Sequence, residues 1–298
     1  MLIYNAIHLR KSMDLELLFM TLGFLFAAYS IIANDAIQTL GTFMSSNIKQ
    51  PWWVLWVFAG SVLSVVLIYG FYTHGGDVSY GRLEKFPVPV TFSFIYMLPP
   101  LVVLVLTRFG IPVSTTFLVL SIFAPTVLTS MLAKSFMGYL IAFAVGLIVA
   151  KYITKNLEMW FMDSKDFKEC PKKYWYVLQW ISTAFLWSQW LIQDLANIYV
   201  YMPTRTLSGV QLSISLVVLL LILGYIFYSK GGAIQKIVTS KTNVTDIRSA
   251  TMIDFLYALI LLIFKEYSTI PMSTTWVFIG LLAGREYALT MALRHKEQ

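Results

Sequence analysis

Long apolar stretches separated by short polar loops dominate the chain. They cover residues 15–32, 52–72, 91–106, 135–150, 176–192, 208–228 and 250–264. A helix needs about 20 mostly apolar residues to cross the hydrocarbon core of a bilayer. These stretches therefore predict transmembrane helices, the shorter of them marginal in length. Residues 112–132 and 271–293 are two further candidates, and each opens on a proline and a polar Ser-Thr-Thr step. The pattern predicts an all-α, polytopic membrane protein.

The composition agrees with a protein whose partner is the lipid bilayer. The chain is 58% hydrophobic and only 12% charged, with a mean hydropathy of +0.72, whereas soluble domains carry about 25% charged residues. Its net charge of +7 is confined to the loops between apolar stretches, which favours a role in topology over the binding of nucleic acid. The predicted location is integral and multi-pass, in the cell (plasma) membrane.

Several motifs recur with a shared spacing. A Pro-x-Ser-Thr-Thr motif occurs at 112–116 and again at 271–275, so the copies are 159 residues apart, as are Asp35 and Asp194. A Phe-Tyr-x-x-Gly-Gly segment recurs at 71–76 and 227–232, with an offset of 156, and its glycines predict turns. Different motifs with one offset indicate an internal duplication. The predicted parts are a first transmembrane repeat (15–132), a linking helix with a charged cytoplasmic loop (133–175) and a second transmembrane repeat (176–293).

The number of membrane crossings decides whether the repeats are parallel or inverted. If the polar stretch after each acidic residue, such as 36–46, is re-entrant and the other segments all cross, five steps separate the first helix from its copy. Because five is an odd number, the second repeat enters the membrane from the opposite side to the first and is therefore inverted. Under this assumption 14 lysines and arginines lie on the linker side and 7 on the other. Because positive residues favour the cytoplasm, we expect a cytoplasmic linker and two inverted-topology repeats with broken helices, the outline of a secondary transporter.

Asp35 and Asp194 stand where apolar stretches end, and each is expected to break its helix. An intramembrane carboxylate is costly and indicates a function, whereas the alternative is a helix cap at the membrane interface. Both residues are flanked by amide side chains, and a carboxylate with amide oxygens suits a hard cation or a proton relay. The predicted coupling-ion ligands, with Na⁺ at the two aspartates, are Asn34, Asp35, Gln38, Gln193, Asp194 and Asn197.

The Ser-Thr-Thr steps offer chemistry of the opposite sign. A proline in the first turn of a helix leaves the following N–H groups free at the positive end of the helix dipole. Free amides and adjacent hydroxyls form a site for a tetrahedral oxyanion, whereas the alternative is that the hydroxyls only cap a kink. Two copies in matching positions favour one shared anion site. Its predicted ligands are Ser114, Thr115, Thr116, Ser273, Thr274 and Thr275.

With these motifs the chain resembles the PiT family of inorganic phosphate transporters. The resemblance rests on Asn34-Asp35-Ala36-Ile37-Gln38 with Gly41-Thr42, on Gln193-Asp194-Leu195-Ala196-Asn197, and on both Pro-x-Ser-Thr-Thr motifs. It implies a duplicated, inverted symporter of inorganic phosphate driven by Na⁺ or H⁺, with sulfate or a related oxyanion as the alternative substrate. It also implies that no cofactor is needed, and a homodimer is the candidate assembly. The chain departs from the family pattern at Gln38, Gln193, Phe117 and Trp276.

Other functions fit the motifs less well. A non-transporting membrane protein that kept the fold need not keep polar groups at both breaks. Discontinuous helices in two matched halves fit alternating access better than a channel. The sequence carries no His/Cys metal cluster, phosphate loop or hydrolase triad, so the chain is not expected to be an enzyme.

Overall fold

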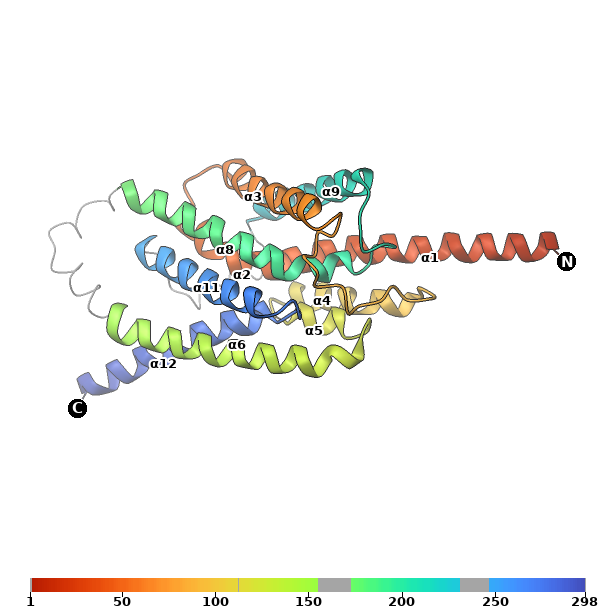
Figure 1. Ribbon diagram of the computed structural model, residues 1–298. Coiled ribbons are helices and arrows are strands. Elements are labelled where there is room, and N and C mark those ends of the chain that lie inside the picture. The colour runs from red at the N-terminus through yellow and green to blue at the C-terminus, as the bar shows by residue number, and fades with distance from the viewer. Residues whose placement is uncertain (1, 112, 155–172, 231–246, 298) are drawn as a thin grey trace.

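The computed structural model describes residues 2–111, 113–154, 173–230 and 247–297. Pro112, most of the predicted cytoplasmic loop (155–172) and the second glycine pair, Gly231 and Gly232, lie outside these residues. Throughout the described ranges the regular structure is helical and no strand occurs (Figure 1). The all-α fold predicted from the apolar pattern is therefore confirmed.

The helices follow the order of the apolar stretches. The first part of the chain forms α1 (Leu2–Ile31), the π-helical turn η1 (Ile32–Ala36), α2 (Ile37–Ser46), α3 (Trp52–Thr73), the 3-10 turn η2 (Phe94–Met97), α4 (Leu98–Arg108), α5 (Thr115–Leu120), the 3-10 turn η3 (Pro125–Val127), α6 (Leu128–Ile148) and the π-helical turn η4 (Val149–Thr154). The second part forms α8 (Lys173–Tyr199), α9 (Gly209–Tyr228), α11 (Ile247–Tyr267) and α12 (Thr274–Glu297).

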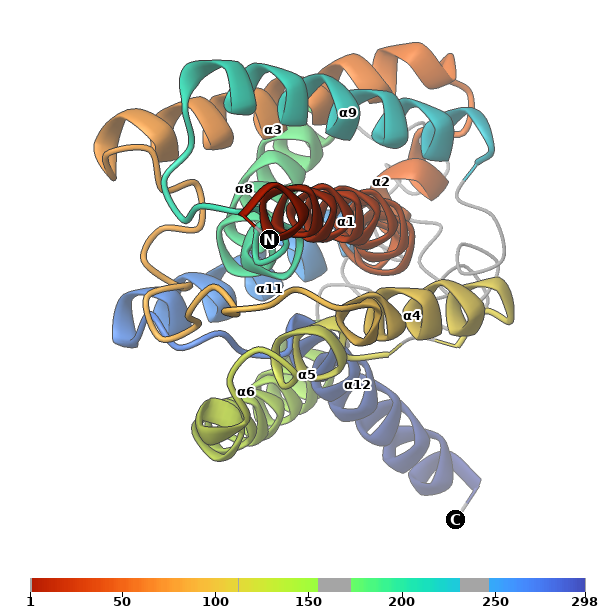
Figure 2. The same cartoon turned by 90° about the vertical axis from the view of Figure 1, so that its right-hand side faces the viewer.

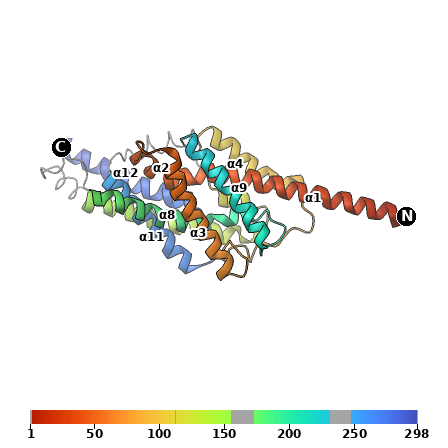
Figure 3. The ribbon, with the colours of Figure 1, turned by 90° about the horizontal axis from the view of Figure 1, so that it is seen from above.

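The bundle is organised around α8. Helices α1, α2, α3, α5, α11 and α12 all contact it. Helices α3 and α9 pack together along one edge, and α6 and α12 pack along the opposite edge (Figure 2). The beginning of α1 projects beyond the bundle (Figure 3). Helix α1 packs on α4 as α8 packs on α11, and these pairs correspond under the 159-residue offset. Whether the repeats are inverted stays a prediction.

Four described segments are long and apolar enough to cross a membrane: Met13–Asp35, Trp52–Thr73, Pro125–Lys151 and Gly209–Tyr228. Large apolar side chains on two of them face outward, among them Val65 (66% exposed) and Leu221 (66% exposed). A soluble protein does not leave such continuous apolar faces in water, so they belong in lipid. Helices α8 and α11 are more polar because they lie inside the bundle, where their polar side chains are buried.

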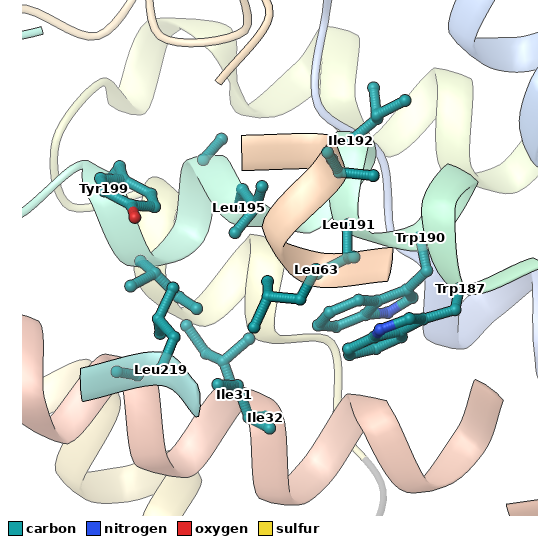
Figure 4. Packing of buried hydrophobic residues seen from close by; sticks show 14 of the residues in the cluster. Ile31, Ile32, Leu63, Trp187, Trp190, Leu191, Ile192, Leu195, Tyr199 and Leu219 are labelled. Carbon is teal, nitrogen blue, oxygen red and sulfur yellow. The ribbon is translucent and has the colours of Figure 1, made fainter. Parts of the chain in front are cut away.

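Aromatic packing fixes α8 against its neighbours. Trp187 and Trp190 stack with their ring centroids 4.8 Å apart and their planes 7° from parallel. The Trp187 indole Nε1–H donates to the carbonyl oxygen of Ala59 on α3 at 3.0 Å. Leu63 of α3 and Leu219 of α9 belong to the same buried cluster (Figure 4). Residues that follow on α8 are therefore held in place relative to α1, α3 and α9.

The helix breaks differ from those predicted. Asp35 does lie in an irregular turn, the π-helical η1. By contrast, α8 continues without interruption through Asp194 to Tyr199, so the break expected there is absent. The candidate span 112–132 is divided between α5, which ends at Leu120, and α6, while α12 is continuous in the second half. Within this π turn the Asn34 side chain reaches across the bundle and donates to the Val113 carbonyl oxygen at 2.9 Å.

Glycines allow the closest helix contact. On α12, Gly280 and Gly284 form a Gly-x-x-x-Gly pair, a spacing that lets membrane helices approach closely. A Cβ at Gly280 would overlap the carbonyl oxygen of Tyr139 on α6, and a Cβ at Gly284 would overlap that of Phe143. Helix α12, which carries the second Ser-Thr-Thr step at its start, is thus seated directly on the α6 backbone.

Candidate anion and cation site

The two aspartates singled out by the sequence are fully buried near the centre of the chain's polar interior. Asp35 in η1 and Asp194 in α8 are both 0% exposed, and their carboxylates lie close enough for each to act on the other electrostatically. No lysine or arginine of the described residues comes within salt-bridge distance of either one. Two buried carboxylates without a paired cation are costly, so their surroundings decide what they do.

Hydrogen-bond donors surround the Asp35 carboxylate. The Thr115 hydroxyl donates to its Oδ2 at 2.6 Å, and the Asn34 amide donates to its Oδ1 at 2.5 Å. A longer bond of 3.4 Å comes from the Gln38 amide. The structure therefore brings together three of the predicted coupling-ion residues and one predicted anion ligand.

The Asp194 carboxylate has a related but incomplete set of partners. Its Oδ1 accepts from the Asn197 amide at 2.8 Å and from the Thr116 hydroxyl at 3.2 Å. Thr274, which corresponds to Thr115, lies near enough to interact with this carboxylate. The Asn197 amide also reaches Thr115 Oγ1 at 3.3 Å. Thr115 thus contacts the acidic motifs of both halves.

The two Ser-Thr-Thr steps lie against each other through reciprocal contacts. Thr116 Oγ1 lies 3.2 Å from the Met272 carbonyl oxygen, which shares the one hydroxyl proton of Thr116 with Asp194 Oδ1, and Thr275 Oγ1 donates to the Val113 carbonyl oxygen at 3.1 Å. Both the donors and the acceptors are related by the 159-residue offset. A contact from i to j matched by one from j to i is the pattern of a two-fold axis, here between two halves of one chain.

Aromatic rings meet beside these contacts. Phe117 and Trp276, the residues that follow the two steps, also correspond under the offset, and they contact each other edge to face with centroids 5.2 Å apart. They are two of the four positions at which the chain departs from the pattern of the family that it resembles.

The serines of the two steps act as helix caps. Ser114 Oγ accepts from the Phe117 backbone N–H at 3.4 Å, and Ser273 Oγ accepts from the Trp276 N–H at 3.2 Å. The capping interpretation therefore holds for the serines, while Thr115, Thr116 and Thr275 make contacts across the bundle. The first step opens a helix of only six residues, α5, whereas the second opens the 24-residue α12.

Unpartnered oxygens gather around the aspartates. Asn34 Oδ1, Asp194 Oδ2 and Asn197 Oδ1 are buried and have no hydrogen-bond donor among the described residues. Leaving a buried acceptor unsatisfied costs about 1–3 kcal/mol, so each such group in a folded protein calls for an explanation. One carboxylate oxygen and two amide oxygens are the kind of ligands that a hard cation takes.

Two further buried charged residues were missed by the sequence reasoning. Asp254 on α11 accepts from the Thr42 hydroxyl at 2.7 Å and from the Thr183 hydroxyl at 2.8 Å. Its place inside the apolar stretch 250–264 was a signal that could have found it. Arg82, in the loop between α3 and α4, donates through Nε to Gln193 Oε1 at 3.1 Å. No repeating sequence pattern distinguishes Arg82 from the other basic residues in the loops.

Arg82 remains charged although it is buried. Burial lowers the pKa of Arg82 to about 10, and the negative charges of Asp194, Asp77 and Glu266 oppose that shift. A pKa near 10 keeps the guanidinium protonated at neutral pH. The site therefore has one fixed positive charge next to the motif that contains Asp194.

A cavity of about 180 Å³ lies elsewhere, between α1 and α9, and its lining includes Leu17, Phe24 and Ile214. It is almost entirely apolar and shares no residue with the polar site. An apolar lining of this kind does not suit a hydrated ion, unlike the polar cluster around Asp35 and Asp194.

Comparisons with known proteins bear on the fold. No protein-family model matches the chain, and no curated protein matches it in sequence. Among solved structures, the fold is similar to that of a chain described as "The sodium-dependent phosphate transporter". The TM-score is 0.60 at 16% sequence identity, and the match covers 93% of this chain and 90% of that chain. This protein therefore shares the fold of that transporter over nearly its whole length.

Proposed function

We propose that this protein is a secondary transporter that carries inorganic phosphate across the plasma membrane in symport with Na⁺. One observation carries the proposal: buried carboxylates from both halves of the chain share hydrogen bonds with threonines of the Ser-Thr-Thr steps, inside a membrane protein. The fold similarity to a sodium-dependent phosphate transporter supports it. No energy source other than an ion gradient is required by this arrangement.

The unpartnered oxygens favour Na⁺ over a proton as the coupling ion. Asn34 Oδ1 and Asn197 Oδ1 are amide oxygens, which can ligate a metal cation but do not take up a proton at physiological pH. Asp194 Oδ2 adds a carboxylate ligand. Oxygen ligands of this kind suit a hard cation. Gln38, which corresponds to Asn197 under the 159-residue offset, and Gln193, which corresponds to Asn34, complete the candidate set.

Electrostatics explains why anion uptake would depend on the cation. Two like charges 4 Å apart repel by about 4 kcal/mol at an effective dielectric constant of 20, so an anion next to Asp35 and Asp194 is strongly disfavoured. A cation at the carboxylates removes that repulsion. It also replaces the hydrogen bonds that Thr115 and Thr116 now donate to the carboxylates, which frees those hydroxyls for the anion. Such coupling is reciprocal, so phosphate should raise the affinity for Na⁺.

The same surroundings favour phosphate over sulfate. At neutral pH inorganic phosphate carries at least one proton, whereas sulfate carries none. A P–OH group can donate to a carboxylate oxygen at the site, while sulfate offers such an oxygen only repulsion. A site built to accept a substrate hydroxyl rejects an analogue that lacks it, because the buried polar group stays unpaired.

The reciprocal contacts suggest how the two halves cooperate. The bonds from Thr116 to Met272 and from Thr275 to Val113 support two repeats that meet at the anion site. In transporters with inverted repeats, substrate binds between the repeats, and alternating access follows when one repeat moves against the other. We propose that residues 15–132 and 176–293 are these repeats, related by an axis in the membrane plane.

Uptake by purified protein in liposomes tests the proposal. Radiolabelled phosphate and sulfate are offered separately, with an inward Na⁺ gradient, an inward proton gradient or neither. We expect phosphate to accumulate only with the Na⁺ gradient and sulfate to accumulate far less. Accumulation of phosphate driven by the proton gradient alone would identify H⁺, and not Na⁺, as the coupling ion. Protein-dependent accumulation of neither anion under any gradient would refute the transport function.

A further inference from the structure

Arg82 is positioned by an ordered loop and not by a helix. The side chain is 3% exposed although it belongs to the connection between α3 and α4. The Asp77 carboxylate accepts from the backbone N–H groups of Ser79 and Gly81, both at 2.7 Å. The Tyr80 hydroxyl donates to the Val66 carbonyl oxygen on α3 at 2.6 Å. These bonds anchor residues 77–81, the segment that leads directly into Arg82.

The backbone just before Arg82 is strained. Tyr80 has φ of +57°, in the left-handed region that side chains other than glycine avoid, and Gly81 follows with φ of +76°. Backbone strain of this kind persists only where the surrounding structure enforces it, and strained residues are common at functional sites. Here it turns the chain so that Arg82 enters the interior beside Gln193.

The Arg82 guanidinium is only partly satisfied. Its Nε bonds to Gln193 Oε1, and its Nη1 has a long contact of 3.5 Å to the Tyr80 carbonyl oxygen. Its Nη2 is buried and has no acceptor among the described residues. No carboxylate in the described ranges lies within salt-bridge distance. A buried, charged donor with an open N–H edge lacks a negatively charged acceptor.

We propose that Arg82 binds the transported anion directly and is its one formally charged ligand. This inference rests on the proposed function above. The Gln193 side chain orients the guanidinium next to Asp194, at the edge of the site reached from the α3–α4 loop. The free guanidinium edge presents paired donors that match the oxygens of a phosphate. Threonine hydroxyls alone would leave the anion's charge without an opposite charge.

The neighbouring cations bind mainly backbone. Lys134 on α6 donates to the carbonyl oxygens of Ser268 and Ile270, both at 2.7 Å, and so positions the segment that leads to the second Ser-Thr-Thr step. Arg205 also has an Nη2 without an acceptor among the described residues, but its other nitrogens donate to the carbonyl oxygens of Phe86, Val200 and Met202 and so fasten two loops together. Neither residue contacts an acidic motif, as Arg82 does.

The test compares Arg82→Gln and Arg82→Lys with Arg205→Lys as the matched control. Binding of inorganic phosphate is measured on purified protein at saturating Na⁺, and Na⁺ binding is measured without phosphate. We expect Arg82→Gln to weaken phosphate binding about tenfold to a hundredfold, which corresponds to about 1.4–2.8 kcal/mol. Arg82→Lys keeps the charge but loses the paired donors, so we expect an intermediate loss. Arg205→Lys should stay within about twofold of wild type.

Sodium binding separates a ligand role from general damage. Loss of a direct anion ligand should leave Na⁺ binding measured without phosphate intact or tighter, because a positive charge near the cation is removed, whereas a misfolded site would lose both. If Arg82→Gln does not fold, the same binding measurements on Arg82→Lys decide the inference. Phosphate affinity within twofold of wild type in a folded Arg82 variant overturns this inference and leaves the transport proposal intact. Failure of the wild-type protein to bind phosphate would instead refute the transport proposal.

Discussion

Replacing Thr115 with valine removes a hydroxyl that contacts the acidic motifs of both halves. Thr115 Oγ1 donates to Asp35 Oδ2 and accepts from the Asn197 amide. The side chain is 1% exposed, and valine has nearly the same shape as threonine. The change therefore deletes two hydrogen bonds without opening a cavity.

The expected loss follows from the kind of bond that is removed. A hydrogen bond to a charged group contributes about 1.5–3 kcal/mol, and a hydroxyl-to-carboxylate distance of 2.6 Å lies in the strong range. In the proposed cycle this hydroxyl turns to the phosphate once Na⁺ occupies the carboxylates. Its loss should then weaken phosphate binding about tenfold to a hundredfold, at 1.4 kcal/mol per factor of ten. Sodium should still bind, because the carboxylate and amide oxygens remain.

The assay is equilibrium binding of radiolabelled phosphate to purified protein at saturating Na⁺, followed by uptake in liposomes. Thr21→Val is the matched control. Thr21 lies on the exposed face of α1, and its hydroxyl donates only to the Leu17 carbonyl oxygen at 2.8 Å. That variant should bind and transport like wild type. Thr274→Val, at the corresponding place in the second half, should weaken phosphate binding in the same direction.

The refuting result is specific. If Thr115→Val and Thr274→Val both elute as folded protein and bind phosphate within about twofold of wild type, the threonines are not anion ligands. The two steps would then be helix caps, as Ser114 and Ser273 already are, and the substrate would have to bind elsewhere.

Three further predictions concern coupling, symmetry and packing. Asp35→Asn and Asp194→Asn should each abolish or uncouple Na⁺-driven uptake in folded protein, since a neutral amide cannot offset the cation's charge; unchanged Na⁺ dependence in both would contradict the assignment. An experimental structure in lipid should superpose residues 15–132 on 176–293 about a two-fold axis in the membrane plane, and an axis along the membrane normal would rule out inversion. Gly284→Ala should lower thermal stability because its Cβ would overlap the Phe143 carbonyl oxygen, whereas Gly209→Ala, which has open space around it, serves as the control.

The duplicated motifs were sufficient to predict which residues correspond. The spacing of 159 residues pairs Thr116 with Thr275 and Val113 with Met272, and the structure places these four residues in reciprocal contact. The apolar pattern predicted the helical fold for a related reason, since the length and polarity of a segment decide whether lipid can surround it. The inversion and the roles of the predicted ligands remain predictions.

The shape of the helices at the acidic motifs could not be predicted in the same way. Both motifs place a carboxylate among amides, yet η1 is distorted at Asp35 while α8 continues through Asp194. The Asn34 side chain in η1 bonds to Val113, 79 positions away in the sequence. Such a contact depends on the tertiary fold, and no local pattern encodes it.

Arg82 escaped the sequence reasoning because its importance also arises from distant contacts. In the sequence it is one of several basic loop residues, which membrane topology explains on its own. Only the fold brings it to Gln193, 111 positions away. Asp254 was accessible in principle, since an acidic residue inside an apolar stretch indicates a function.

The crossed bonds between the two Ser-Thr-Thr steps set how firmly these segments hold each other. Thr116 to Met272 and Thr275 to Val113 are both neutral bonds, and such a bond contributes about 0.5–1.5 kcal/mol. Because Thr116 shares its one proton with Asp194, the pair contributes at most about 3 kcal/mol, or roughly 150-fold. In the transport cycle proposed above, contacts of this strength would hold the two repeats together between steps and would still let them part.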